Sequence, residues 1–313
     1  MKKNNFNIVG NKKIFFIISS ALIALIMLFT IIFKVDVAIE FKGGTIITYS
    51  YSGEVDLNDV ASNVNAILGL KANVRQGEDF ASGQKTLEIS LVSKNGLTAD
   101  KQFDLTNKLQ EIYKDNNPQL ISSSDVNPSS GRDFFNKCLV AVLFAAIVLI
   151  VYIAIRFRII GGWSAGAMAV VALIHDVIIV FGTFVIFRIP IDANFMAVVL
   201  TILGYSINDT IVIYDRIREN RKLYGKKKSI DELVNLSINQ SLTRSIHTSV
   251  STAAAMIVVS IVAMIFNVNS ILSFSFPMII GIISGTYSTI CIAGPLWVTW
   301  ENSNLRKKML AKK

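Results

Sequence analysis

Six long apolar stretches dominate this 313-residue sequence and decide what it can fold into. Each is at least as long as the roughly 18 residues that a helix needs to cross a bilayer core of about 30 Å. The stretches cover residues 14–33, 134–155, 163–187, 195–214, 246–266 and 271–300. Pro277 and Pro295 are expected to break the last one. The pattern predicts a polytopic α-helical membrane protein with six transmembrane helices.

The distribution of charge predicts the topology. The formal net charge is +9, but residues 34–133 hold 10 Lys/Arg against 14 Asp/Glu, so that segment carries −4 and the rest carries +13. If the six helices alternate, the remaining basic clusters all lie on one side of the membrane: residues 2–13, 156–158, 216–228 and 306–313. By the positive-inside rule both termini are cytoplasmic and residues 34–133 are extracytoplasmic. The positive charge therefore indicates topology and not nucleic-acid binding.

Other signals narrow the class of protein. The first apolar stretch exceeds the usual 7–15 residues of a signal peptide, and no small-residue cleavage pattern precedes Lys34, so we expect it to be retained. Cys138 and Cys291 both lie inside predicted helices, which suggests neither a disulfide framework nor a metal site. Metalloprotease, serine-hydrolase, kinase and P-loop motifs do not occur. The sequence therefore predicts neither an enzyme nor a bound cofactor.

Residues 34–133 predict a small α+β domain between the first two membrane helices. The expected elements are a strand near 46–49, a helix over 57–68 capped by Asp56, strands at 72–75 and 86–92, a helix over 98–114 and a strand at 119–126. The order β-α-β-β-α-β is typical of a ferredoxin-like sandwich. We expect residues 122–132, rich in Ser, Asn and Pro, to act as a linker.

The chain is thus predicted to have four parts. They are a cytoplasmic N-terminus with the first helix (1–33), the extracytoplasmic domain and linker (34–133), the remaining helices with a cytoplasmic loop at 215–245 (134–300), and a basic cytoplasmic tail (301–313).

One residue in the fourth apolar stretch needs a special explanation. Asp209 lies among polar neighbours, and on a helix Thr201, Tyr205, Asn208, Asp209 and Val212 share one face, with Ser206 and Thr210 beside it. A carboxylate at the centre of a membrane helix costs roughly 2.5–3.5 kcal/mol on insertion scales, so something must compensate it. Intramembrane carboxylates are usually functional, which makes Asp209 the leading candidate for an ion-binding residue.

Arg244, at the start of the fifth apolar stretch, is the long cation nearest to Asp209 in the sequence. A pair between them would offset the cost of burying the carboxylate and could be cycled by protonation. A carboxylate that opens alternately to each side can couple ion entry to a change of shape. Thr248 belongs to a hydroxyl stripe on the same predicted helix, together with Ser245, Ser249 and Thr252.

Each of these residues also has a simpler interpretation. Asp209 could make only a structural hydrogen bond to hydroxyls of the fifth helix, and Arg244 could be an interfacial arginine that extends toward water. His175 and Asp176 form either a second titrating pair or an orienting bond between helices. Asp215 and Arg216 are expected to anchor the cytoplasmic end of the fourth helix. The GxxxG pattern at 281–285 allows close helix packing.

Residues 204–220, with the sequence GYSINDTIVIYDRIREN, resemble the fourth-helix signature of the SecF family. The Ser-x-Asn-Asp-Thr core favours SecF over its sister family SecD. Residues 41–45 (FKGGT), 172–176 (ALIHD) and 240–249 (QSLTRSIHTS) match more weakly. Over nearly its full length the chain resembles the SecF subunits of the SecDF protein-export complex, within the resistance-nodulation-division superfamily. Glu40 departs from the family's aspartate, which leaves the role of that exterior turn undefined.

The resemblance implies a subunit in the bacterial cytoplasmic (inner) membrane that uses the proton motive force. It implies a SecD partner with six further membrane helices, and an exterior domain that assists unfolded polypeptides after the SecYEG channel and the SecA ATPase have begun transport. It places the family's ion-path aspartate on Asp209 and its arginine partner on Arg244. The transported ion is expected to be a proton, with sodium as the alternative.

Two rival functions remain open on the sequence. A passive scaffold of a membrane translocon would tolerate Asp209→Asn but not enlargement of Gly281 or Gly285. Half of an ion-coupled small-molecule efflux transporter would need an apolar pocket, for which the small acidic exterior domain leaves little room.

Overall fold

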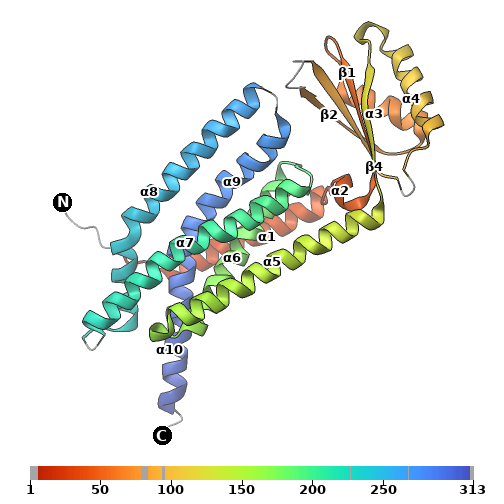
Figure 1. The fold of residues 1–313 in the computed structure, drawn as a ribbon. Helices are drawn as coiled ribbons and strands as arrows, with labels where there is room; N and C mark the ends of the chain where they lie inside the picture. Colours follow the sequence, from red (N-terminus) through yellow and green to blue (C-terminus); the bar gives the residue numbers. More distant parts are fainter. Residues whose placement is uncertain (1–5, 79–83, 94–95, 226, 267, 311–313) are drawn as a thin grey trace.

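The computed structural model, which describes residues 6–78, 84–93, 96–225, 227–266 and 268–310, is a helical bundle with an α/β domain at one end (Figure 1). Six helical segments are long and apolar enough to cross a membrane, which confirms the predicted fold class. The bundle consists of α1 (Lys12–Phe33), α5 (Pro128–Arg156), α6 (Gly162–Ile186), α7 (Ala193–Tyr224), α8 (Ile230–Ile265), α9 (Asn269–Ser288) and α10 (Gly294–Leu310). A π-helical turn, η3 (Thr289–Ala293), joins α9 to α10.

Three of the six membrane spans form the interior of the bundle: α6, α7 and the span made by α9 and α10. More than half of the residues in the most apolar windows of α6, α7 and α9–α10 are buried, against fewer than a fifth in α1, α5 and α8. The exposed residues of the outer helices are largely apolar, which suits contact with lipid or with another membrane subunit. Polar groups buried between α6, α7 and α9 are therefore shielded from lipid by protein.

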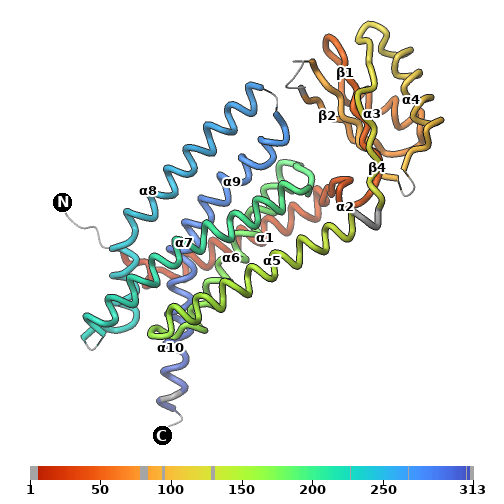
Figure 2. The backbone as a smooth tube through the Cα atoms, viewed as in Figure 1, coloured from red at the N-terminus to blue at the C-terminus, as the bar shows by residue number. Residues whose placement is uncertain are grey.

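The α/β domain follows α1 and a short helix, α2 (Ile39–Lys42), and returns to the bundle through α5 (Figure 2). Its elements are β1 (Gly44–Tyr51), α3 (Leu57–Leu68), β2 (Ala72–Glu78), β3 (Lys85–Leu91), α4 (Ala99–Ile112) and β4 (Gln119–Val126). The strand order is β2-β3-β1-β4, and every neighbouring pair is antiparallel. This is the predicted ferredoxin-like arrangement.

Alternation along the strands separates an apolar face of the sheet from a polar one. Ile47, Ile89 and Leu91 are fully buried in the core that the sheet forms with α3 and α4. The side chain of Asp56 caps α3 by accepting a hydrogen bond from the Asn58 N–H, and Gly69 ends the helix in the left-handed conformation (φ 66°). The opposite face carries the intervening residues, which include Asn73, Arg75, Glu88 and Ser90, and it lies toward the membrane helices.

Three local predictions were wrong. The expected linker at 122–132 does not form, because β4 continues to Val126 and α5 begins at Pro128. The expected loop at 215–245 is mostly helix: α7 extends to Tyr224, and a capping box between Ser229 and Glu232 starts α8. Pro277 lies inside α9 without ending it, and the irregular turn η3 comes just before Gly294 and Pro295 instead.

The Tyr113 side chain joins α4 to α3 by hydrogen bonds, and its titration is expected to lower the stability of the α/β domain at alkaline pH. Its hydroxyl donates to Asp59 Oδ2 at 2.6 Å and accepts from Asn63 Nδ2 at 2.8 Å, and burial raises the pKa of Tyr113 to about 12. Because this pKa is raised in the folded state, the Tyr113 contribution to stability is complete below about pH 10 and is lost as the pH rises through 12. Tyr113→Phe should flatten the pH dependence of the unfolding midpoint in that range.

The control for this measurement is Tyr224→Phe, because Tyr224 is 40% exposed at the far end of α7. An unchanged pH profile in Tyr113→Phe, measured by circular dichroism during heating at pH 9–12.5, would show that Tyr113 does not titrate as described.

Candidate functional site

Asp209 lies in the interior part of α7, next to α8. The side chain is only 4% exposed, and among the described residues its Oδ2 atom has no hydrogen-bond partner. The facing hydroxyl comes from Ser245 of α8. This hydroxyl is also buried and, among the described residues, forms no hydrogen bond of standard geometry. A buried carboxylate oxygen without a donor is unusual, since such atoms are nearly always satisfied. The Ser245 hydroxyl is therefore the group placed to interact with the Asp209 carboxylate.

Arg244 lies on α8 next to Ser245. It is close enough to act electrostatically on Asp209, but its own side chain is exposed, and within the described part of the chain the two residues form no ion pair. Thr248, one turn further along α8, donates its hydroxyl to the Arg244 carbonyl at 3.0 Å. Asp209 and Arg244 are thus neighbours across the α7–α8 contact and are not directly paired in this conformation.

A second carboxylate, Asp176 of α6, lies at the centre of the bundle with 0% exposure. Three serine hydroxyls donate to it: Ser206 of α7 at 2.8 Å, and Ser284 and Ser288 of α9 at 2.7 and 2.6 Å. We call Asp176 and these three serines the Asp176 cage. Hydrogen bonds to a charged acceptor contribute about 1.5–3 kcal/mol each, so the cage can offset much of the cost of burying the charge. Asp176 thereby connects the three interior helices.

His175 adds a local contact to this cage. Its Nδ1 lies 3.2 Å from Asp176 Oδ1, and among the described groups its buried Nε2 has no partner. The contact between His175 and Asp176 stays within α6, but Asp176 itself makes the orienting bonds between helices that one of the two predicted interpretations expected, through serines of α7 and α9.

A chain of hydroxyls leads from the cage toward Asp209. The Ser206 carbonyl accepts from Thr210 at 3.2 Å and from Thr289 at 3.3 Å, and the hydroxyls of Thr210 and Thr289 lie 3.2 Å apart. Thr210 follows Asp209 directly, and Thr289 begins the π-helical turn η3. Single π-helical turns are often found at functional sites. The Asp176 cage therefore extends as one polar region of α6, α7 and α9 up to Thr210, the residue after Asp209, and no hydrogen bond within the described residues continues it to the Asp209 carboxylate.

Small residues allow the interior helices to approach closely enough for these bonds. A Cβ atom added to Gly285 would lie 3.1 Å from the Ser206 Cβ, and one added to Gly281 would collide with the Ile202 side chain. The predicted GxxxG pattern thus packs α9 against α7, immediately beside the Ser206–Asp176 hydrogen bond.

Gly285→Val should separate α9 from α7 and lower the stability of the chain by about 1–3 kcal/mol, the usual cost of overpacking. The matched control is Gly204→Val, because a Cβ atom there has nothing within 4 Å. Thermal unfolding of the purified chain in detergent compares the two variants. Equal unfolding midpoints would contradict close packing at Gly285.

The other predicted supporting residues lie outside this polar region. Asn208 is exposed on the outer side of α7. Asp215 pairs with Arg156 at 3.2 Å and with Arg218 at 2.7 Å, and Arg216 pairs with Glu219 at 2.6 Å, all with partly exposed side chains. These are surface ion pairs at the end of the bundle away from the α/β domain, as expected for an anchor.

Sequence reasoning did not identify Ser284, Ser288 or Thr289 as site residues. The available signal was the spacing of Ser284 and Ser288, which are four residues apart on the same helical face as Gly281 and Gly285. Within the described ranges no group of three or more His, Cys, Asp or Glu side chains converges as a metal site.

Comparison with known proteins gives consistent similarities. Residues 105–303 match the family described as protein export membrane protein SecD/SecF, C-terminal. The chain is 33% identical to the protein translocase subunit SecF of Alicyclobacillus acidocaldarius, over 97% of this chain and 96% of that protein. It is 36% identical to the SecF subunit of Calditerrivibrio nitroreducens, over 97% and 96% of the two chains.

A longer relative and a solved structure extend this comparison. The protein translocase subunit SecDF of Bacillus subtilis is 31% identical over 96% of this chain, which covers 39% of that protein. The crystal structure of SecDF, a translocon-associated membrane protein from Thermus thermophilus, superposes with a TM-score of 0.78 at 27% identity, over 96% of this chain and 40% of that one.

Proposed function

This chain belongs to the SecD/SecF family of protein export membrane proteins, and on that basis we propose that it is the ion-driven accessory subunit of a Sec translocase. In this role it uses the proton motive force to assist the late export of unfolded polypeptides across the bacterial cytoplasmic membrane. The chain matches about 40% of the length of SecDF proteins. A separate SecD subunit would supply the remainder, and the SecYEG channel with SecA would supply the translocating polypeptide.

The observation that carries this proposal is the burial of the Asp209 carboxylate beside a hydroxyl instead of an ion-paired cation. Within the described chain its Oδ2 forms no hydrogen bond of standard geometry, and the Ser245 hydroxyl can interact with either charge state, so the carboxylate can take up a proton while α7 and α8 stay packed. Its charge is balanced by Arg244 from a distance, so either charge state can be accommodated by a small movement of α8 against α7. Few other oxygen ligands surround Asp209, which favours a proton over sodium as the coupled ion.

Contacts at the start of α7 support a route from Asp209 to the α/β domain. The Asp192 side chain caps α7 by accepting from the Phe195 N–H, and Glu40 of α2 accepts from the Ala193 N–H at 3.0 Å. Asp209 lies 16 residues after Ala193, about 24 Å along the helix. A shift of α7 would therefore move α2, which leads directly into β1 of the exterior domain.

The available energy is sufficient for such a movement. One elementary charge crossing 100 mV releases about 2.3 kcal/mol. Allosteric coupling between sites is typically about 1–3 kcal/mol, so one or two protons per stroke can shift the balance between two conformations.

Genetic complementation tests the role in export. In cells that lack the endogenous SecF, this chain produced with its SecD partner should restore the late stage of secretion only while a proton gradient is maintained. Full restoration after the gradient is collapsed with an ionophore would favour the passive scaffold, which is the second candidate.

A further inference from the structure

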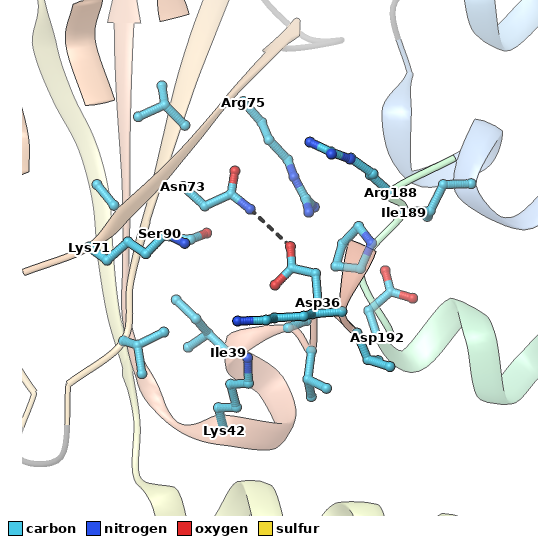
Figure 3. Close-up of a pocket in the computed structure, with 18 of the residues that line it drawn as sticks. Asp36, Ile39, Lys42, Lys71, Asn73, Arg75, Ser90, Arg188, Ile189 and Asp192 are labelled. Carbon is cyan, nitrogen blue, oxygen red and sulfur yellow. Dashed lines mark hydrogen bonds between the residues drawn. The ribbon is translucent and has the colours of Figure 1, made fainter. Parts of the chain in front are cut away.

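A cavity of about 780 Å³ separates the polar face of the sheet from the nearest ends of the membrane helices (Figure 3). Asn73, Arg75, Glu88 and Ser90 line it from the α/β domain. The ends of α1 and α6, and the turn before α7, line it from the bundle. One hydrogen bond crosses the cavity, from Asn73 Nδ2 to Asp36 Oδ2 at 3.4 Å. The route proposed above from Asp209 to the α/β domain borders this space, because Glu40 and Asp192 line it.

Five basic side chains line the cavity, and none of them has an ion pair or a hydrogen bond among the described residues. They are Lys34, Lys42, Lys71, Arg75 and Arg188. Arg188 stacks over the Phe33 ring, with its guanidinium carbon 5.1 Å from the ring centroid. Figure 3 shows the side chains of Arg75 and Arg188 extending into the same space from opposite walls. Two guanidinium groups that converge without forming an ion pair to a described acid form a good receptor for phosphate oxygens.

Three of the four acidic side chains in the described wall already accept a hydrogen bond. Glu40 and Asp192 accept hydrogen bonds from backbone N–H groups at the start of α7, and Asp36 accepts from Asn73. Arg75 acts on Asp192 only at longer range, without pairing. Glu88 is the one remaining acid in the wall as described. The free hydrogen-bonding capacity of the cavity is therefore mainly that of donors.

The wall formed by α1 is apolar and continuous with the outer surface of the bundle. Ile32 and Phe33 line the cavity, and they are also 57% and 37% exposed. Ile31, which precedes them on α1, is 77% exposed. Lys34 ends this helix with φ 58° and ψ 164°, a conformation that costs a non-glycine residue about 1–3 kcal/mol and persists only where the surroundings enforce it. A basic group is thus held directly at the boundary of the apolar surface.

We propose that this cavity binds the phosphate headgroup of an acidic phospholipid between Arg75 and Arg188, with the acyl chains lying along the exposed end of α1. The apolar surface that leads into the cavity favours a lipid over a soluble phosphate or an acidic peptide, neither of which would need it. Because Arg75 belongs to the sheet and Arg188 to the bundle, the bound lipid links the α/β domain to the membrane helices. Lipid binding by the two arginines does not require a change in the charge of Asp209.

Native mass spectrometry of the full chain in detergent, titrated with phosphatidylglycerol, tests this site. The double variant Arg75→Gln/Arg188→Gln should raise the apparent Kd of the retained lipid at least tenfold, as expected for the loss of a charge-assisted hydrogen bond. Arg75→Lys/Arg188→Lys keeps the charges and should retain more binding than the glutamine variant. The matched control is Arg132→Gln, which removes an exposed arginine near the start of α5, outside the cavity.

Three results would overturn the proposal. The first is equal retention of phosphatidylglycerol by the wild type and the double glutamine variant. The second is binding of glycerol phosphate as tight as that of the whole lipid, which would make the cavity a site for soluble phosphates. The third is displacement of the lipid by an acidic unfolded peptide at lower concentration than glycerol phosphate requires, which would make the cavity a peptide site. Folding of each variant is checked by its thermal unfolding midpoint.

Discussion

Asp209→Asn is expected to abolish the gradient-driven component of export while leaving the chain folded and at its normal level in the membrane. Asparagine has nearly the volume of aspartate and can still interact with Ser245, so packing of α7 against α8 should be preserved. It cannot take up a proton, so the alternation between a charged and a neutral side chain is lost. Export should fall to the level of cells without this subunit, measured as the rate at which a secreted precursor matures in a pulse-chase experiment.

Asp215→Asn is the matched control for this experiment. Asp215 is a carboxylate on the same helix, but it lies in partly exposed ion pairs with Arg156 and Arg218, which contribute only about 0–1 kcal/mol. Its export activity should remain close to that of the wild type. If Asp209→Asn also exports at the wild-type rate under a normal gradient, the ion-coupled function is wrong and the scaffold function is favoured.

Asp176→Ala should cause the largest loss of stability among single substitutions in the bundle. The change removes the acceptor for Ser206, Ser284 and Ser288 and leaves three buried hydroxyls facing an empty space. Breaking a buried charged network typically costs about 3–5 kcal/mol. The thermal unfolding midpoint of the purified chain should therefore drop by roughly 6–20 °C, at about 2–4 °C per kcal/mol for a chain of this size.

Ser288→Ala provides the graded comparison, since it removes one of the three bonds and should cost about 1.5–3 kcal/mol. A decisive contrary result would be an Asp176→Ala midpoint within 2 °C of the wild type. The carboxylate would then not connect α6 to α7 and α9, and the hydrogen bonds of the cage would contribute little to the stability of the bundle.

Local patterns in the sequence predicted the fold class well. The lengths of the apolar stretches were sufficient to count the membrane helices, and the alternation of Leu87, Ile89 and Leu91 was sufficient to identify a strand with one buried face. The ferredoxin-like order followed because each short element carried its own periodicity, and Asp56 capped α3 as predicted. These features depend only on residues close together in the chain.

The same reasoning failed where distant segments decide the outcome. The charged residues after Tyr214 resembled a loop, but ion pairs and contacts between α7 and α8 keep them helical, as in the hydrogen bond from Asn220 to Ser237. Asp209 could be selected as a candidate because a lone carboxylate in an apolar run is costly wherever its helix packs. The importance of Asp176 depends on serines of two other helices, and no periodicity within α6 predicts which helices become its neighbours.

The central claim is that one buried carboxylate changes its charge state as ions cross, and export-linked current tests it most directly. The experiment uses membrane vesicles that contain this chain with SecD and the translocase, at varied pH and with or without sodium. Proton coupling through Asp209 predicts a current that rises with the proton gradient, persists without sodium and disappears in Asp209→Asn. A current of normal size in Asp209→Asn vesicles would contradict it.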